Sequence, residues 1–416
     1  MKKTLTLIMM LFALSACASF GRGIAEAILD KSEKTEDTRK CQIKGQDIQG
    51  LEQFFNNKKK AKVMMIHGVG THNSGYSARI RNNLAQSLGL DILSRKPKNI
   101  VLLNPTDGKT IIGNLQVTRM QNDKKTKDLI FYELTWSQNT NKDKQIIAYD
   151  YSGEYSYQRS PFNQTMKKFL DDVLPDPMAY VSKEGTLIKN AAKQSICWML
   201  SYSWNDLPDD AKRVCSVSSY KQIENLNDEN IAFITHSLGS RILMDSMTNI
   251  VNDISKAEEN NNQEAKRIVQ QLKNKDITVF MLANQLPILQ IGQTMPKVHN
   301  QIKQYCSPKG KFYNQRIFKN FNIIAFSDPN DLLSYDIQQS FADKYIDSRL
   351  CPHVTNVNIN IASEISAFGI AVVNPLTAHT EYDNDNRVIN IITHGYNEKT
   401  NTKEMNRSCS FYRLDD

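Results

Sequence analysis

The chain has 416 residues, of which 40% are hydrophobic and 23% are charged. A chain of this length buries a core that needs no covalent staple, and α/β enzymes often use it as one domain with insertions. The formal net charge of +8 is a mild excess that suits contact with an anionic lipid surface. No concentrated basic stripe carries interleaved aromatic side chains, so we expect no nucleic-acid partner.

The N-terminus predicts export. Two lysines precede an apolar stretch, residues 5–14, which is too short to span a bilayer and is closed by Leu14-Ser15-Ala16-Cys17. Residues 1–16 therefore resemble a bacterial lipoprotein signal peptide. The resemblance implies cleavage before Cys17 and attachment of membrane lipid to its sulfur, which anchors a protein without a transmembrane helix.

The residues after the lipidated cysteine bear on its destination. Ala18 and Ser19 follow Cys17 without an aspartate, a sorting pattern that in Gram-negative lipoproteins favours the outer membrane. An uncleaved membrane anchor is the alternative, and the short apolar stretch with its Ser-Ala-Cys ending argues against it.

Residues 17–60 are polar and poorly periodic, and we expect a tether with some irregular cover before the folded domain. The lysine cluster at its end, Lys58 to Lys60 with Lys62, is expected to be a solvated approach to the first strand. Apart from Cys17, six cysteines remain, an even number that is compatible with disulfides in an exported protein. No pair has CxxC spacing, so neither a metal site nor a redox motif nor a cofactor is expected.

The first strand is predicted over residues 63–66 and ends in the glycine-bearing turn His67-Gly68-Val69-Gly70. A helical pattern with Ile80, Leu84 and Leu88 follows. Glycine in such a turn lets the backbone approach a substrate, so the N–H group of Val69 or Gly70 is a candidate oxyanion donor. A plain strand-to-helix turn is the alternative. His67 and His72 are expected to shape this loop.

Further strands are predicted over residues 110–118 and 129–136. Residues 137–228 then contain several helical patterns and separate these strands from the next predicted strand. They form either a cap over the site or, in part, core helices on one face of the sheet.

Ser237 lies in the run from Ile231 to Ser240, where an apolar strand leads through a small-residue turn into a helix. Such a turn holds a serine hydroxyl clear of the backbone and points the N–H groups of the new helix, that of Leu238 first, at a reacting oxygen. The usual motif Gly-x-Ser-x-Gly has Thr235 in place of its first glycine. A helix N-cap serine is the alternative reading.

Acidic residues follow another predicted strand in the run Asn322 to Tyr335. Asp331 is the preferred partner for a histidine, because Leu332 and Leu333 would anchor its loop in the core. Asp328 is the second candidate, and for both residues an Asx turn is the simple alternative.

A histidine that could act with Ser237 and one of these acids is expected near the C-terminal end of the chain. His379 lies in a loop after the predicted strand 354–361, and His394 follows the apolar run 388–392 as the alternative base. His353 precedes its strand and therefore lies at the wrong edge of the sheet. The tail from residue 397 is polar.

Oxyanion turn, serine elbow, acid and histidine follow one another in the chain order of the α/β-hydrolase superfamily. Over residues 61–396 the chain resembles the lipase- and esterase-like members of that superfamily. The resemblance implies an α/β-hydrolase fold with a mostly parallel central sheet flanked by helices and a helical cap. It also implies that Ser237, His379 and Asp331 cleave carboxylic esters, lipid or phospholipid esters in particular. A catalytically inactive binding or envelope-assembly lipoprotein on the same scaffold is the alternative function.

Overall fold

The computed structural model describes residues 40–58, 60–93, 96–149, 159–215, 228–367, 370–397 and 407–413. The predicted signal peptide and Cys17, the predicted lipidation site, lie outside these residues.

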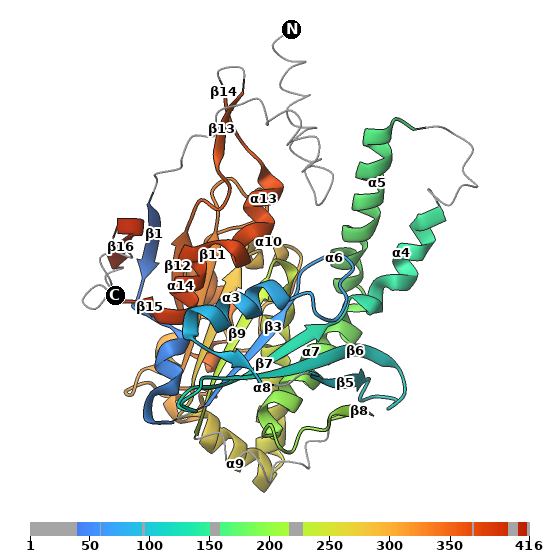
Figure 1. The fold of residues 1–416 in the computed structure, drawn as a ribbon. Helices are drawn as coiled ribbons and strands as arrows, with labels where there is room; N and C mark the ends of the chain where they lie inside the picture. Colours follow the sequence, from blue (N-terminus) through green and yellow to red (C-terminus); the bar gives the residue numbers. More distant parts are fainter. Residues whose placement is uncertain are drawn as a thin grey trace.

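A 12-stranded sheet forms the centre of the molecule (Figure 1). Its middle strands, β7, β3, β9, β10, β11 and β12, are parallel neighbours in that order. Their bounds are Asp128–Thr135, Lys60–Ile66, Glu229–His236, Asp276–Leu282, Asn320–Ser327 and Pro352–Asn358. The fold is therefore α/β with a mostly parallel sheet. Because the strands are parallel, the loops that leave their carboxyl ends meet at one edge.

Shorter strands extend the sheet on both sides. The antiparallel pair β6 and β5 continues from β7, β8 pairs with β5, and β4 pairs with β6. At the other side β1 pairs with β12, and β16 pairs with β1. These strands are Ile111–Gln121, Lys98–Leu103, Asp210–Arg213, Asp91–Ile92, Cys41–Gly45 and Cys409–Arg413.

Both faces of the sheet are covered, which explains why the middle strands are nearly continuous apolar runs. In β3, Met64 and Ile66 point into one core, and Val63 and Met65 point into the other. The first core includes α7 (Gly185–Ser201), α8 (Leu238–Glu259) and α9 (Gln263–Leu272). The second includes η1 (Leu51–Lys58), α3 (Ala78–Leu88) and α14 (Asn386–His394).

The segment 137–228 divides between the two predicted roles. Its long helix α7 packs in the core against the sheet, and β8 extends the sheet. The shorter helices α4 (Asn141–Ala148), α5 (Pro161–Val173) and α6 (Pro175–Tyr180) lie to one side, with α4 and α5 projecting from the body (Figure 1). We call α4, α5 and α6 the cap helices.

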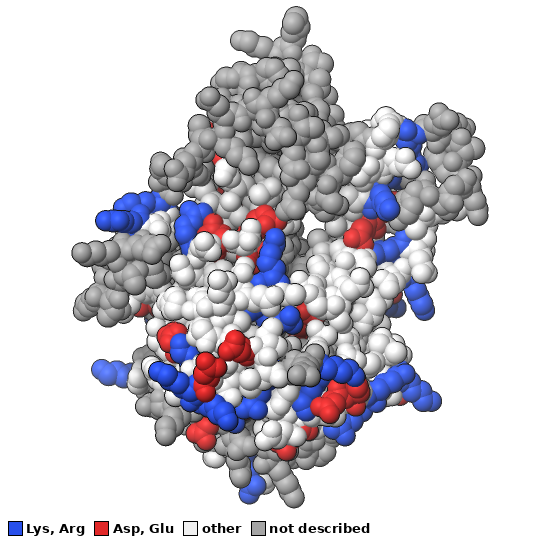
Figure 2. All heavy atoms as spheres, viewed as in Figure 1, with Lys and Arg blue, Asp and Glu red and all other residues white. Residues whose placement is uncertain are grey.

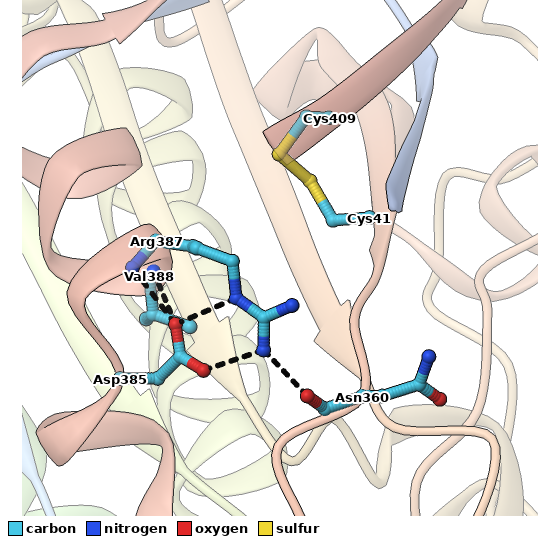
Figure 3. Close-up of a disulfide and its surroundings, with 6 residues drawn as sticks. All are labelled: Cys41, Asn360, Asp385, Arg387, Val388 and Cys409. Atoms are coloured by element: carbon cyan, nitrogen blue, oxygen red, sulfur yellow. Dashed lines mark hydrogen bonds and ion pairs between the residues drawn. A yellow bond between two sulfur atoms is a disulfide. The ribbon is translucent and has the colours of Figure 1, made fainter. Parts of the chain in front are cut away.

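Parts of the segments predicted to be tether and tail form strands of the sheet. Strands β1 and β16 lie side by side in parallel, and a disulfide joins Cys41 to Cys409 (Figure 3). The short strand β2 (Ile48–Gln49) pairs with β15 (Gly395–Tyr396). Segments from the N-terminal and C-terminal parts of the described chain are thus paired with each other.

Polar contacts fix the helix that lies next to this disulfide. Asp385 accepts hydrogen bonds from the backbone N–H groups of Arg387 and Val388 at the start of α14. The guanidinium of Arg387 binds the same carboxylate and donates to the carbonyl of Asn360 (Figure 3). The loop after β12 is therefore attached to α14.

Two further disulfides lie within the described residues. Cys197 of α7 pairs with Cys215, and Cys306 of α11 (Ile302–Cys306) pairs with Cys351 before β12. Every cysteine other than Cys17 is thus paired. Smaller elements complete the fold: η2 (Ser137–Thr140), α10 (Leu286–Leu289), η5 (Tyr313–Gln315), α12 (Gln339–Tyr345), η6 (Ser348–Leu350), β13 (Glu364–Ala367), β14 (Ile370–Val373), α13 (Pro375–Thr380) and η7 (Glu381–Asn384).

Candidate active site

Ser237 lies in the sharp turn between β9 and α8, at the carboxyl edge of the sheet. Its φ of 54° and ψ of −123° are strained for a residue other than glycine. The backbone N–H of Ser237 donates to the carbonyl of Leu282 at 3.0 Å, which fixes the turn against the end of β10. A strained serine between a buried strand and a buried helix has the geometry of a nucleophile elbow.

Two glycines allow this turn to pack against the end of β3. A Cβ atom on Gly239 would lie 2.4 Å from the carbonyl oxygen of Ile66, and one on Gly68 would lie 2.7 Å from Cβ of Ser237. Both positions therefore exclude a side chain. Thr235, which replaces the first glycine of the usual motif, is accommodated as a fully buried strand residue.

The turn after β3 is held by two histidines. Trp136 donates its backbone N–H to Nε2 of His67 at 3.1 Å, so the proton of the neutral ring lies on Nδ1, 2.8 Å from the carbonyl of Gly68. Burial lowers the pKa of His67 well below its ordinary value, which keeps the ring neutral. His72 stacks on His67 and contacts the carbonyl of Gly70 at 3.0 Å. The expected loop-shaping role of both residues agrees with these contacts.

The two candidate oxyanion donors of this loop differ in their contacts. The N–H of Gly70 donates to Oδ2 of Asp176 at 2.6 Å and is therefore already occupied. For the N–H groups of Val69 and Leu238 no hydrogen bond to a described residue is found. Of the expected donors, Val69 and Leu238 thus remain open to a ligand, and Gly70 does not.

Asp331 and His379 are brought together from segments that follow β11 and β12. Nδ1 of His379, in the short helix α13, lies 2.8 Å from Oδ2 of Asp331 and 3.0 Å from its Oδ1. Burial alone would raise the pKa of Asp331, but the hydrogen bond and charge of His379 outweigh it and hold that pKa below its ordinary value. The carboxylate accepts, so Nδ1 carries the proton of this hydrogen bond.

Asp328, the second candidate acid, has a different role. Its carboxylate accepts the backbone N–H groups of Asn330, Ile361 and Ala362 and thus joins the loops after β11 and β12. The Asx turn considered for this residue is present.

The prediction that two leucines anchor the loop of Asp331 in the core is wrong. Leu332 and Leu333 are 52% and 42% exposed and do not anchor their loop in the core. The loop is held instead by two hydrogen bonds between Asn284 and Tyr335. Nδ2 of Asn284 donates to the carbonyl of Tyr335, and the backbone N–H of Tyr335 donates to the carbonyl of Asn284.

His394 and His353 are not brought to the elbow by the structure. His394 ends α14, where Nε2 contacts Ser87 Oγ at 3.2 Å and Nδ1 lies 4.0 Å from Glu52. Among the described residues these contacts join His394 to α3 and η1, and no contact with Ser237, Asp331 or Asp328 is found. His353 lies inside β12, close to its start, so it too is far along the strand from the carboxyl edge.

His236 is a site residue that sequence reasoning missed. Its Nε2 lies 2.8 Å from the backbone carbonyl of His379, and the two rings meet edge to face at 5.2 Å. Burial, with a smaller contribution from His379, lowers the pKa of His236 to about 3, so this ring is neutral. Its place directly before the serine was the one signal available.

Ser237 itself is closed off in this structure. The side chain is 1% exposed, and Oγ has no hydrogen-bond partner among the described residues, His379 included. The His236 contact shows that α13 lies beside the elbow. Catalytic hydrogen bonds are often long or absent before a substrate binds.

Exposed apolar side chains are concentrated in segments that follow the carboxyl ends of the strands. They come from the cap helices after β7 and from the loops after β10, β11 and β12: Ile146, Ile147, Leu174, Met178, Val181, Ile291, Met295, Leu332, Leu333 and Val372. Figure 2 shows basic and acidic side chains intermixed on the visible face, with uncharged surface between them. In the described part of the chain, exposed apolar side chains thus lie on segments that leave the edge of the sheet that holds Ser237.

Comparison with known proteins finds no family model, no curated protein and no solved structure that matches the chain. In the described part of the chain, none of the helices combines the length and apolar character needed to cross a membrane. The same residues contain no group of three or more metal-ligating side chains. Any functional conclusion therefore depends on the geometry of the site.

Proposed function

We propose that this protein is a serine hydrolase of the α/β-hydrolase type that cleaves carboxylic esters. The observation that carries the proposal is the strained elbow at Ser237 beside the hydrogen-bonded pair His379–Asp331. Support also comes from chain order, because the oxyanion turn, the serine, the acid and the histidine come after β3, β9, β11 and β12, in that order, and these strands belong to the parallel part of one sheet.

The proposed reaction is a two-step acyl transfer. Nε2 of His379 takes the proton of Ser237 as Oγ attacks the ester carbonyl, and Asp331 stabilises the imidazolium through Nδ1. The N–H groups of Leu238 and Val69 are the proposed donors to the oxyanion. The alcohol then leaves with the proton, and water attacks the acyl-enzyme by the same base to release the acid.

Lipid or phospholipid esters are the proposed substrate class. The exposed apolar side chains around the carboxyl edge favour a substrate with an aliphatic part. The proposed attachment of Cys17 to the outer membrane would place the site next to such lipids, and the mild basic charge suits anionic head groups.

A second candidate is a catalytically inactive lipoprotein that binds a partner in the cell envelope. The observation that favours it is the burial of Ser237 Oγ without a hydrogen bond to His379. If the turn never opens, the triad residues would only stabilise the fold.

A panel of aryl and phospholipid esters distinguishes the two candidates. We expect the purified mature protein to hydrolyse at least the short aryl esters, and Ser237→Ala to abolish that hydrolysis without unfolding the protein. Hydrolysis that survives in Ser237→Ala would exclude Ser237 as the nucleophile. A folded wild-type protein that cleaves no ester would support the binding function.

A further inference from the structure

We propose that Asp176 and Lys144 of the cap helices are positioning residues that hold the oxyanion turn in its working conformation. This inference rests on the proposed hydrolase function. It assigns to the cap helices a part in catalysis that is separate from any contact with substrate.

Asp176 is a buried carboxylate whose oxygens are all used. Its side chain is 0% exposed, Oδ2 accepts the N–H of Gly70 at 2.6 Å, and Oδ1 accepts the hydroxyl of Thr140 at 2.6 Å. A buried carboxylate is costly unless it is paired, so its position at the start of α6 requires a specific arrangement of partners.

Lys144 supplies the compensating charge. Its Nζ, on α4, lies 3.2 Å from Asp176 and 3.1 Å from Asp172 Oδ1 on α5. Asp172 in turn accepts the N–H and the hydroxyl of Thr71 at 3.0 Å and 2.5 Å. Two carboxylates, four residues apart, thus bind two consecutive backbone amides, and one lysine lies between them.

These contacts fix the peptide planes next to the candidate oxyanion donor. Gly70 has a φ of +96°, a conformation that is available mainly to glycine and is held here by Asp176 on one side and His72 on the other. Because a peptide unit is planar, fixing the N–H of Gly70 also fixes the carbonyl of Val69. The direction of the Val69 N–H then depends only on the φ and ψ angles of Val69.

The arrangement couples the cap to the chemistry. The contacts to residues 70 and 71 come from α4, α5 and α6, so a displacement of these helices would displace the oxyanion turn as well. An oxyanion donor that moves by about 1 Å can cost about 100-fold in rate. The clamp formed by Asp176, Lys144 and Asp172 therefore gives the position of the cap a direct effect on turnover.

The test compares Asp176→Asn and Lys144→Met with the control Lys142→Met, which removes an exposed lysine from the same helix. Hydrolysis of a short aryl ester is measured, and each preparation is normalised by counting the serines that react with a fluorophosphonate. We expect kcat per reactive serine to fall about 10- to 100-fold in Asp176→Asn and Lys144→Met, with KM changed less than about 2-fold. Lys142→Met should match the wild type.

A second measurement does not depend on activity. With glycine labelled by ¹⁵N, the amide proton of Gly70 should resonate far downfield, because it donates to a carboxylate, and should shift upfield in Asp176→Asn. An unchanged kcat in Asp176→Asn of an active enzyme would overturn the positioning role alone. An unchanged Gly70 resonance would show that the clamp is absent. A wild-type protein without esterase activity would overturn the proposed function and, with it, any catalytic role for the clamp.

Discussion

The side chain of His236 holds the backbone of His379. Nε2 of His236 lies 2.8 Å from the carbonyl oxygen of His379, and since a carbonyl only accepts, this nitrogen carries the proton. The residue directly before the candidate nucleophile thus fixes the helix that carries the candidate base. Strand β9 and helix α13 are 143 residues apart in sequence at this contact.

Replacement of His236 tests this contact. We expect His236→Ala to lower kcat/KM for an aryl ester about 10-fold or more, because α13 loses a buried hydrogen bond and His379 is no longer held beside the elbow. His236→Gln, which keeps a donor, should recover part of the loss. The control is His299→Ala, because Nδ1 of His299 contacts the carbonyl of Pro296, outside the site. Equal activity of His236→Ala and His299→Ala would show that the contact has no catalytic consequence.

Asp331 and Asp328 make opposite predictions. Asp331→Asn cannot hold the proton on Nδ1 of His379, so we expect kcat to fall by about three to four orders of magnitude. Asp328→Asn weakens the hydrogen bonds to residues 361 and 362 and should mainly lower the melting temperature. Steady-state kinetics and thermal unfolding of both variants check this. A larger kinetic effect at Asp328 would reverse the assignment of the acid.

The pair Asp331–His379 also predicts a dependence of stability on pH. The pKa of Asp331 lies below its ordinary value of 3.8 in the folded protein. Its ionised form therefore stabilises the fold at pH values above about 4, and this contribution is lost as the pH falls through the lower folded pKa. The free energy of unfolding by urea, compared between wild type and Asp331→Asn, should differ less at pH 2 than at pH 6. A difference that stays constant would refute this linkage.

The buried ion pair Lys62–Glu229 makes a prediction about stability alone. Nζ of Lys62 lies 2.6 Å from Oε2 of Glu229, with side-chain exposures of 1% and 5%. We expect Lys62→Met to cost about 3–5 kcal/mol of unfolding free energy, because it leaves a buried carboxylate unpaired. The double variant Lys62→Met/Glu229→Gln should recover most of this loss. Lys60→Met, at an exposed position of the same strand, is the control, and an equal effect there would show that the buried ion pair is not the cause of the loss.

Local patterns were sufficient to predict the class of fold and the strands that carry the site. Predicted strands at 63–66 and 129–136, and the predicted strand that leads to Ser237, correspond to β3, β7 and β9, because apolar runs of this length are buried wherever they pack. Ser237 was found for the same reason, since strand, turn and helix are adjacent in sequence. The elbow needs no long-range contact to be recognised.

Features that depend on distant contacts were missed. Lys62 was expected to be solvated because its neighbours are lysines, whereas Glu229 and the carbonyls of Met199 and Tyr202 hold it in the core. Strands β1 and β16 are short and polar in part, and only their pairing and the disulfide place them in the sheet. The contact of Gly70 with Asp176 spans 106 residues, so no local pattern could have indicated it.

The assignment of Ser237 as the nucleophile is tested most directly by the reaction of the purified mature protein with a fluorophosphonate, followed by mass spectrometry of the labelled peptide. An activated serine is phosphonylated in competition with water, whereas an ordinary serine is inert. We expect one label per chain, on Ser237, and none in Ser237→Ala or in His379→Ala. A folded wild-type protein that takes no label, or takes it at another serine, would contradict the assignment of Ser237 as the nucleophile.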